Sequence, residues 1–178
     1  MRPVLIVEDH PLVAEATGKL LACYGDDIRT VICSNAAQAI EMLDDRDESW
    51  FRIFLDLDVP GAYGLSLARE VQQRGLASRC CVVSAFENRE YIEEIRSWGF
   101  LGYITKAVTV AEFTAALTNV LNAEPSFPSG IATPPSSSSP RASGCCGSAA
   151  VEAVRTYARS SSCSGRSGAS SFEPRSWT

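Results

Sequence analysis

Four apolar runs of the sequence end in polar side chains that could do chemistry together. Those side chains are Glu8 and Asp9, then Asp56 and Asp58, then Ser84, then Thr105 and Lys106. If the runs are parallel strands of one sheet, their carboxyl ends meet at the edge where such sheets form their functional crevice. Three or four carboxylates, a hydroxyl and an ammonium group would then face one another.

The carboxylates of Glu8, Asp9 and Asp56 cannot all stay ionised side by side without help. Two unit charges about 4 Å apart repel by roughly 4 kcal/mol at an effective dielectric constant near 20. Mg²⁺ relieves such repulsion, because it prefers oxygen ligands and typically takes one or two carboxylates together with phosphate oxygens of a substrate. The cluster therefore predicts a Mg²⁺ site with open positions for a phosphoryl group.

Phosphoryl transfer would give each remaining side chain a role. Lys106 would pair with one phosphoryl oxygen and Ser84 would donate a hydrogen bond to another, which supplies the charge stabilisation that this reaction needs. Asp56 would be the nucleophile and would form an acyl phosphate. Taken singly, Asp9 could simply cap the next helix, and His10, the only histidine, fits an exposed loop residue. Such separate explanations would need four independent coincidences at one edge.

The elements that would position these residues alternate between strand and helix. The strands are almost continuously apolar, which is typical of a parallel sheet covered on both faces, and amphipathic stretches lie between them. Five βα units in about 120 residues predict an α/β domain with a doubly wound, five-stranded parallel sheet. The expected strands are 3–7, 28–33, 51–56, 79–85 and 101–105, and the expected helices are 11–25, 35–46, 63–75, 88–99 and 109–122.

Composition divides the chain at Ala123. With 178 residues, 46% of them hydrophobic, the chain can bury one core of ordinary domain size. We expect this domain at residues 1–122, a linker rich in Pro and Ser at 123–140, and a low-complexity tail at 141–178. The tail has few aliphatic residues, so we expect it to be largely disordered, with at most one short helix at 149–159.

Charge and cysteine content favour a cytoplasmic protein. The net charge of -5 argues against a general surface for nucleic acids or anionic membranes. The seven cysteines are odd in number and contain no CxxC pair, which favours reduced thiols over a disulfide framework. The apolar run in the opening MRPVLIVEDH is only four residues long, so we expect neither a signal peptide nor a membrane span.

Several motifs with characteristic spacing resemble the receiver domain of two-component response regulators. They are VEDH at 7–10, FLDLDVPGAYG at 54–64, VVSA at 82–85 and GYITK at 102–106. The resemblance covers residues 1–122 and implies a CheY-like (βα)5 fold with strand order 2-1-3-4-5. The linker sequence NAEPSFPSGIATPP also resembles the segment that leads to the helix-turn-helix domain of LuxR and NarL-type regulators, although no intact domain of that kind follows.

The resemblance implies a role for each acidic residue. Asp56 matches the aspartate that accepts the phosphoryl group, and Glu8 and Asp9 match the acidic pair that holds Mg²⁺. Asp58 matches the position whose backbone carbonyl completes the metal site. The chain would then be a signalling domain that catalyses its own phosphotransfer and dephosphorylation, rather than an enzyme with an external substrate.

The resemblance also assigns the residues on the last two strands. Lys106 matches the invariant lysine, and Ser84 and Tyr103 match the hydroxyl and aromatic switch residues. Their rearrangement would couple phosphorylation to the face formed by the fourth helix, fifth strand and fifth helix. The chain departs from many receivers at Ala107, where they have proline.

The expected partner is a sensor histidine kinase or a phosphotransfer protein, with a homodimer or a downstream protein as the output. Specific DNA binding is not expected, because the candidate helix 149–159 has no second and third helix to pack against. Two alternatives stay open for the domain: a phosphatase like the haloacid dehalogenases, suggested by the Asp-x-Asp at 56–58, and a pseudo-receiver that only binds partners. The tail is either a native flexible segment or a frame-shifted remnant of an output domain.

Overall fold

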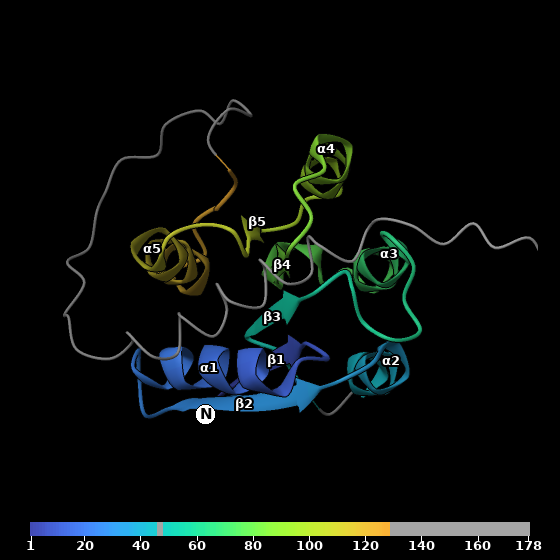
Figure 1. The fold of residues 1–178 in the computed structure, drawn as a ribbon. Coiled ribbons are helices and arrows are strands. Elements are labelled where there is room, and N and C mark those ends of the chain that lie inside the picture. Colours follow the sequence, from blue (N-terminus) through green and yellow to red (C-terminus); the bar gives the residue numbers. More distant parts are fainter. Residues whose placement is uncertain (46–47, 129–178) are drawn as a thin grey trace, which may run out of the picture.

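Five parallel strands form one sheet in the order β2-β1-β3-β4-β5 in the computed structural model (Figure 1). The structure describes residues 1–45 and 48–128, so the predicted tail at 141–178, its helix at 149–159 and most of the linker lie outside the described residues. The predicted strand order is confirmed. The strands are β1 (Arg2–Val7), β2 (Ile28–Cys33), β3 (Arg52–Leu55), β4 (Cys80–Ser84) and β5 (Gly102–Thr105).

Helices cover both faces of the sheet, which confirms the doubly wound architecture. In Figure 1 α1 and α5 lie on one face, and α2, α3 and α4 lie on the other. A single turn of 3-10 helix at Ala77–Arg79 precedes β4. The helices are α1 (Pro11–Ala22), α2 (Ala36–Asp44), α3 (Ser66–Gln73), α4 (Arg89–Ser97) and α5 (Val110–Leu121).

The strands are apolar on both faces because each face is buried under helices. Every residue of β3, β4 and β5 is buried. Successive side chains of β3 point to opposite faces: Ile53 and Leu55 belong to the core beneath α2, α3 and α4, and Phe54 belongs to the core beneath α1 and α5. This pattern explains why the sequence shows continuous apolar runs rather than alternation.

Local signals fix most helix ends, although the helices are shorter than predicted. Asn35 accepts a hydrogen bond from Gln38 N at 2.9 Å and begins α2. Gly75 and Gly99 follow α3 and α4 with positive φ angles of 71° and 79°, as expected for glycine after a helix. The first helix ends at Ala22 rather than near residue 25.

The four described cysteines form no disulfide bond with one another, which agrees with the reduced thiols that the composition predicts. Cys33, Cys80 and Cys81 are buried within the sheet, whereas Cys23 is exposed directly after α1. Burial raises the pKa of the Cys33 thiol, so this group stays protonated. No helix within the described part of the chain is both long and apolar enough to cross a lipid bilayer.

Candidate functional site

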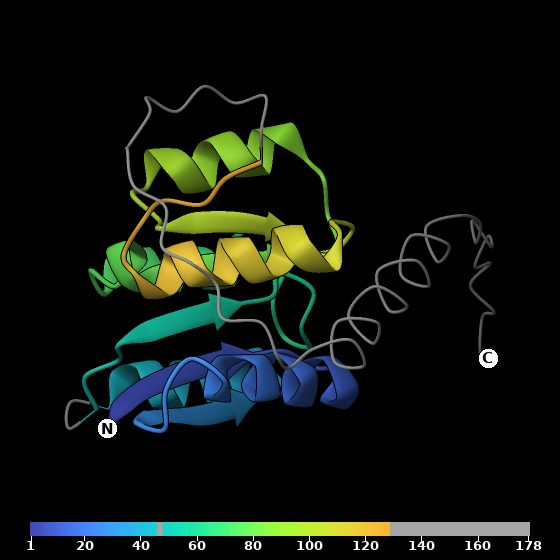
Figure 2. The same ribbon diagram turned by 90° about the vertical axis from the view of Figure 1, so that its left-hand side faces the viewer.

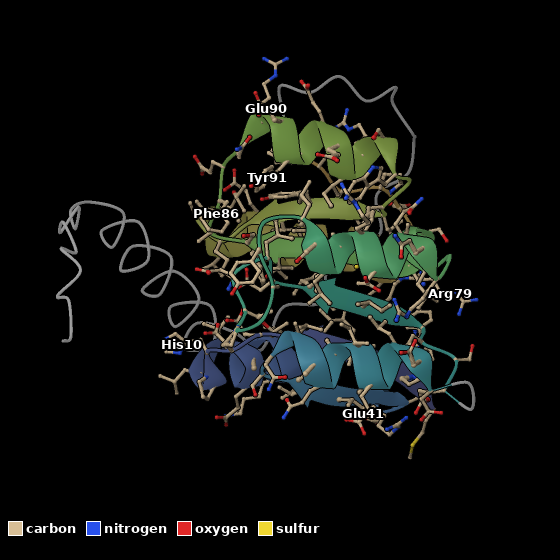
Figure 3. All side chains as sticks on the ribbon, turned by 90° about the vertical axis from the view of Figure 1, so that its right-hand side faces the viewer. His10, Glu41, Arg79, Phe86, Glu90 and Tyr91 are labelled. Atoms are coloured by element: carbon tan, nitrogen blue, oxygen red, sulfur yellow. The ribbon has the colours of Figure 1, made fainter. Side chains whose placement is uncertain are left out.

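The predicted polar residues meet at the carboxyl edge of the sheet. Backbone hydrogen bonds between neighbouring strands continue one residue past each strand and fix these positions. Glu8 N donates to Cys33 O at 2.9 Å, Asp56 N to Val7 O at 2.9 Å, and Lys106 N to Ser84 O at 2.8 Å. Figure 3 shows His10 and Phe86 at this edge and Arg79 at the opposite end of the domain.

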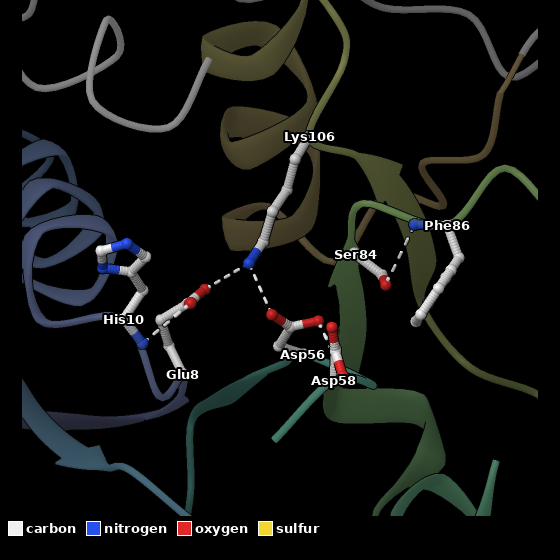
Figure 4. Close-up of polar contacts among 7 residues, drawn as sticks. All are labelled: Glu8, His10, Asp56, Asp58, Ser84, Phe86 and Lys106. Carbon is white, nitrogen blue, oxygen red and sulfur yellow. Dashed lines mark hydrogen bonds and ion pairs between the residues drawn. The ribbon is translucent and has the colours of Figure 1, made fainter. Parts of the chain in front are cut away.

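Lys106 lies between two buried carboxylates (Figure 4). Its Nζ donates to Asp56 Oδ2 at 2.5 Å and to Glu8 Oε2 at 2.6 Å. Lys106 is 1% exposed, Asp56 2% and Glu8 5%. Charges are rarely buried this deeply unless they are paired, so this cluster of one ammonium and two carboxylates is held together by its own charges.

The other oxygens of these carboxylates accept backbone hydrogen bonds. Asp58 N donates to Asp56 Oδ1 at 3.1 Å, and His10 N donates to Glu8 Oε1 at 3.2 Å. The backbone two residues after each carboxylate therefore fixes the orientation of that carboxylate. His10 is half-buried at the start of α1, and its side chain makes no cap hydrogen bond to that helix.

Burial and charge oppose each other in this cluster. Burial raises the pKa of Glu8 to about 7, and the Asp56 carboxylate adds to this rise while Lys106 opposes it. Burial lowers the pKa of Lys106, but the carboxylates of Asp56 and Glu8 outweigh burial, so the pKa of Lys106 lies above its usual value. The lysine is therefore charged, and Glu8 titrates near neutral pH.

A divalent cation fits beside this cluster. Ligand oxygens of Glu8, Asp9 and Asp56 all lie within 4.8 Å of one another. Asp9 Oδ1 is buried and has no hydrogen-bond partner among the described residues, which leaves it available as a metal ligand. Burial raises the pKa of Asp9, and the Asp56 carboxylate adds to this rise while Lys106 opposes it.

The site opens to solvent beside Asp9. A cavity of about 430 Å³ is lined by Asp9, Asp58 and residues 59–63. The side chain of Asp58 is exposed there. The cavity therefore borders Asp9 on the side of the loop that follows β3.

Ser84 and Tyr103 are both hydrogen-bonded to the backbone of Phe86. Ser84 Oγ accepts from Phe86 N at 3.3 Å, and Tyr103 Oη donates to Phe86 O at 2.8 Å. Both side chains are buried. Burial raises the pKa of Tyr103, so its hydroxyl keeps its proton.

Two features of the site were not expected from the sequence. Lys106 Nζ donates to both Glu8 and Asp56, whereas the sequence predicted a phosphoryl oxygen as its partner. The backbone of Phe86 connects Ser84 with Tyr103, and no sequence signal identifies this carbonyl. The Lys106–Ala107 peptide bond is trans, like every described peptide bond.

A family model and several curated proteins match most of the described residues. The family model described as "Response regulator receiver domain" matches residues 4–118. The transcriptional regulatory protein ComA of Bacillus subtilis is 28% identical over 126 residues, which cover 70% of this chain and 58% of ComA. The nitrate/nitrite response regulator protein NarL of Escherichia coli is 27% identical over 114 residues, which cover 64% of this chain and 52% of NarL. The chain thus spans a little over half the length of these curated relatives.

Solved structures show the same fold. A two-component response regulator of the LuxR family from Aurantimonas sp. SI85-9A1 superposes with a TM-score of 0.59 and 23% identity, covering 70% of this chain and 87% of that chain. The non-phosphorylated HemR receiver domain from Leptospira biflexa gives a TM-score of 0.59 and 19% identity, covering 76% of this chain and all of that receiver-domain chain. At these identities the likeness concerns the fold.

Proposed function

The chain belongs to the response regulator receiver family, whose members act in two-component signalling, and we propose that Asp56 is its phosphoacceptor. Receiver domains work with histidine kinases or phosphotransfer proteins and bind Mg²⁺ at an acidic pocket. The observation that carries the proposal is the pairing of the buried Asp56 carboxylate with the Lys106 ammonium group at 2.5 Å. A buried carboxylate with a fixed cation beside it, close to Asp9 and Asp58, which line an open cavity, suits a nucleophile.

In the proposed reaction a carboxylate oxygen of Asp56 attacks the phosphorus of a phosphohistidine. The new P–O bond forms as the P–N bond breaks, and the imidazole nitrogen keeps the bonding electrons and takes a proton from solvent. Lys106 stabilises the charge on the phosphoryl oxygens, and Ser84 Oγ donates a hydrogen bond to one of them. Hydrolysis of the acyl phosphate by water would return the domain to its starting state.

Glu8, Asp9 and Asp56 would hold the Mg²⁺ ion, together with the backbone carbonyl of Asp58. The unpartnered Oδ1 of Asp9 supports this assignment. The ion would supply charge neutralisation for the carboxylates and the incoming phosphoryl group. The exposed Asp58 side chain would stay outside the metal site and modulate how water reaches the acyl phosphate.

Ser84 and Tyr103 would act as the switch residues, and the face formed by α4, β5 and α5 would carry the signal. Movement of Ser84 toward the phosphoryl oxygens would change the hydrogen bonds of Phe86, on which Tyr103 depends. The output would be a homodimer or a complex with a downstream protein. The cytoplasm, where phosphorylated kinase domains reside, would be the compartment.

Intact-mass measurement tests this function directly. The full chain is incubated with acetyl phosphate and Mg²⁺, and we expect one added phosphoryl group. The addition should disappear in Asp56→Asn and on chelation of the metal, whereas Asp58→Asn should retain it as the matched control. A folded protein whose mass does not change would contradict the proposal and favour a pseudo-receiver. Catalytic turnover of many phosphate esters would instead favour a phosphatase.

A further inference from the structure

The chain continues past α5 and pairs with the edge of β5. Ser126 forms a parallel bridge with Gly102. Tyr103 N donates to Ser126 O at 2.7 Å, and Ser126 N donates to Leu101 O at 3.0 Å. Residues 124–128, which we call the strap, therefore lie along an edge where an unpaired strand would expose its backbone groups. Figure 2 shows the strap, in orange, crossing beside β5 between α4 and α5.

A sharp turn after α5 directs the strap back to the sheet. Ala123 N donates to Val120 O at 3.1 Å and Glu124 N donates to Asn119 O at 2.8 Å, which is the hydrogen-bond pattern of a Schellman turn. Ala123 has a φ angle of 64°, a conformation in which glycine is usually preferred. Ala123, at the turn that directs the strap toward β5, thus has an unfavourable backbone conformation.

Side chains also hold the strap in place. Phe127 packs against the core beneath α2, α3 and α4, and the Arg96 guanidinium of α4 lies 4.5 Å from the centre of its ring. A Cβ atom on Gly102 would lie 2.4 Å from Ser126 O, so the absence of a side chain at Gly102 allows this close approach. The strap and α5 together line a groove of about 370 Å³.

Hydrogen bonds connect the strap to the candidate phosphorylation site in three steps. Ser84 Oγ accepts from Phe86 N, Phe86 O accepts from Tyr103 Oη, and Tyr103 N donates to Ser126 O. Tyr103 therefore takes part in two contacts: its hydroxyl faces the site and its backbone amide holds the strap. A displacement of Tyr103 would change both contacts at once.

From this arrangement we propose that the strap is an intramolecular cover of the β5 edge, and that phosphorylation of Asp56 releases it through Ser84, Phe86 and Tyr103. The second half of the inference rests on the proposed function. In the unphosphorylated state the strap occupies the backbone groups of Leu101 and Tyr103 and part of the surface between α4 and α5.

Thermodynamic linkage makes the coupling between phosphorylation and release of the strap reciprocal. If phosphorylation favours the released strap, then weakening the strap must favour the phosphorylated state by the same factor. Ser126→Pro removes the N–H that donates to Leu101 O and should loosen the strap. Ser126→Ala keeps both backbone hydrogen bonds and removes only the hydroxyl group, so it is the matched control.

Amide hydrogen exchange of the full chain, measured residue by residue, tests the strap. We expect the Tyr103 amide to exchange at least about tenfold faster in Ser126→Pro than in Ser126→Ala or the parent chain, where a tenfold change corresponds to about 1.4 kcal/mol. The amide of Phe54 in β3 reports whether the fold is intact. Equal protection of Tyr103 in all three proteins, with the Phe54 amide unchanged, would overturn the proposal that the strap covers this edge.

The same measurement after treatment with acetyl phosphate and Mg²⁺ tests the coupling. Exchange at the Tyr103 and Ser126 amides, which form the two hydrogen bonds between the strap and β5, should become faster in the parent chain but not in Asp56→Asn, and Ser126→Pro should reach a higher phosphorylated fraction at the same donor concentration. A phosphoryl group present by mass with unchanged exchange at both amides would overturn the coupling and leave the proposed function standing. Absence of the phosphoryl group would overturn the proposed function and the coupling together, whereas the result for Ser126→Pro would still decide the strap.

Discussion

Lys106 Nζ lies 2.5 Å from Asp56 Oδ2, although the two residues are 50 positions apart in the chain. The same nitrogen lies 2.6 Å from Glu8 Oε2. One buried cation thus compensates two buried carboxylates that follow different strands. Without this cation, two like charges would be left in an environment that solvates them poorly.

Replacing Lys106 should therefore destabilise the domain strongly. We expect Lys106→Met to lower the free energy of unfolding at pH 8 by about 3–5 kcal/mol in the absence of Mg²⁺, because removal of one partner leaves uncompensated buried charge. Urea denaturation measures this loss, and added Mg²⁺ should restore part of it. Lys19, the other lysine of the chain, pairs with Glu15 on the exposed face of α1, so Lys19→Met should change stability by less than about 0.5 kcal/mol. Similar small effects of both substitutions would contradict this account of the cluster.

The stability of the metal-free domain should depend on pH through Glu8. Its pKa in the folded protein is about 7, above the usual value of 4.5, chiefly because it is buried. The stabilising contribution of the protonated group is complete below the unfolded pKa and is lost as pH rises through the folded pKa. We therefore expect the free energy of unfolding, measured with a chelator present, to fall by about 1 kcal/mol between pH 6 and pH 8.

Glu8→Gln is the control for this pH dependence, because glutamine has a similar shape and does not titrate. The substitution should flatten the dependence between pH 6 and pH 8 and weaken Mg²⁺ binding. The exposed carboxyl groups of Asp27 and Asp44, whose pKa values are lowered by arginine partners, titrate well below this window. A slope that persists unchanged in Glu8→Gln would show that another group is responsible.

Substitutions of Asp9 and Asp58 should have different effects on the affinity for Mg²⁺. Asp9 contributes a buried oxygen that has no other partner among the described residues, whereas the Asp58 side chain is exposed and only its backbone is assigned to the metal. Asp9→Asn should weaken Mg²⁺ binding by at least about tenfold, which corresponds to about 1.4 kcal/mol. Asp58→Asn should change the affinity by less than about threefold, a difference of roughly 0.6 kcal/mol. Calorimetric titration measures both, and a larger loss in Asp58→Asn would place the Asp58 side chain among the ligands.

The free energy of unfolding should also depend on the left-handed conformation of Ala123. Ala123→Gly should raise the free energy of unfolding by about 0.5–1 kcal/mol, because glycine adopts the left-handed conformation without steric cost. Ala115 is an exposed residue within α5, and Ala115→Gly should lower stability by about 1 kcal/mol. The same substitution is thus expected to act in opposite directions at two sites eight residues apart. Destabilisation at both sites, measured by urea denaturation, would contradict the left-handed conformation of Ala123.

The rule that functional residues gather at the carboxyl ends of parallel strands explains why most of the site could be predicted. Apolar runs that end in Glu8, Asp56, Ser84 and Lys106 read as parallel strands, and parallel strands bring their carboxyl ends to one edge. The roles of Asp58 and Tyr103 came from the resemblance to receivers rather than from spacing. The burial of Tyr103 and the hydrogen bonds of both residues depend on tertiary packing, which the sequence pattern does not contain.

The pairing of the strap with β5 could not be predicted from the sequence. The richness in Pro and Ser from Ala123 onward predicts a linker, yet residues 124–128 pair with β5 and contact α4. A single bridged residue, Ser126, carries no periodic signal, and alanine is an unfavourable residue for the conformation found at Ala123. The ends of the helices were missed for a related reason, because α1 ends at Ala22 without glycine at its cap.

The most direct test of the central claim identifies the carboxyl group that carries the phosphoryl group. The protein treated with acetyl phosphate and Mg²⁺ is reduced with borohydride, which converts an aspartyl phosphate to homoserine, and the reduced residue is located by peptide mass spectrometry. We predict homoserine at position 56 alone, with none at positions 9 and 58. Homoserine at another position, or none in a folded protein that binds Mg²⁺, would contradict the assignment of Asp56 as the phosphoacceptor.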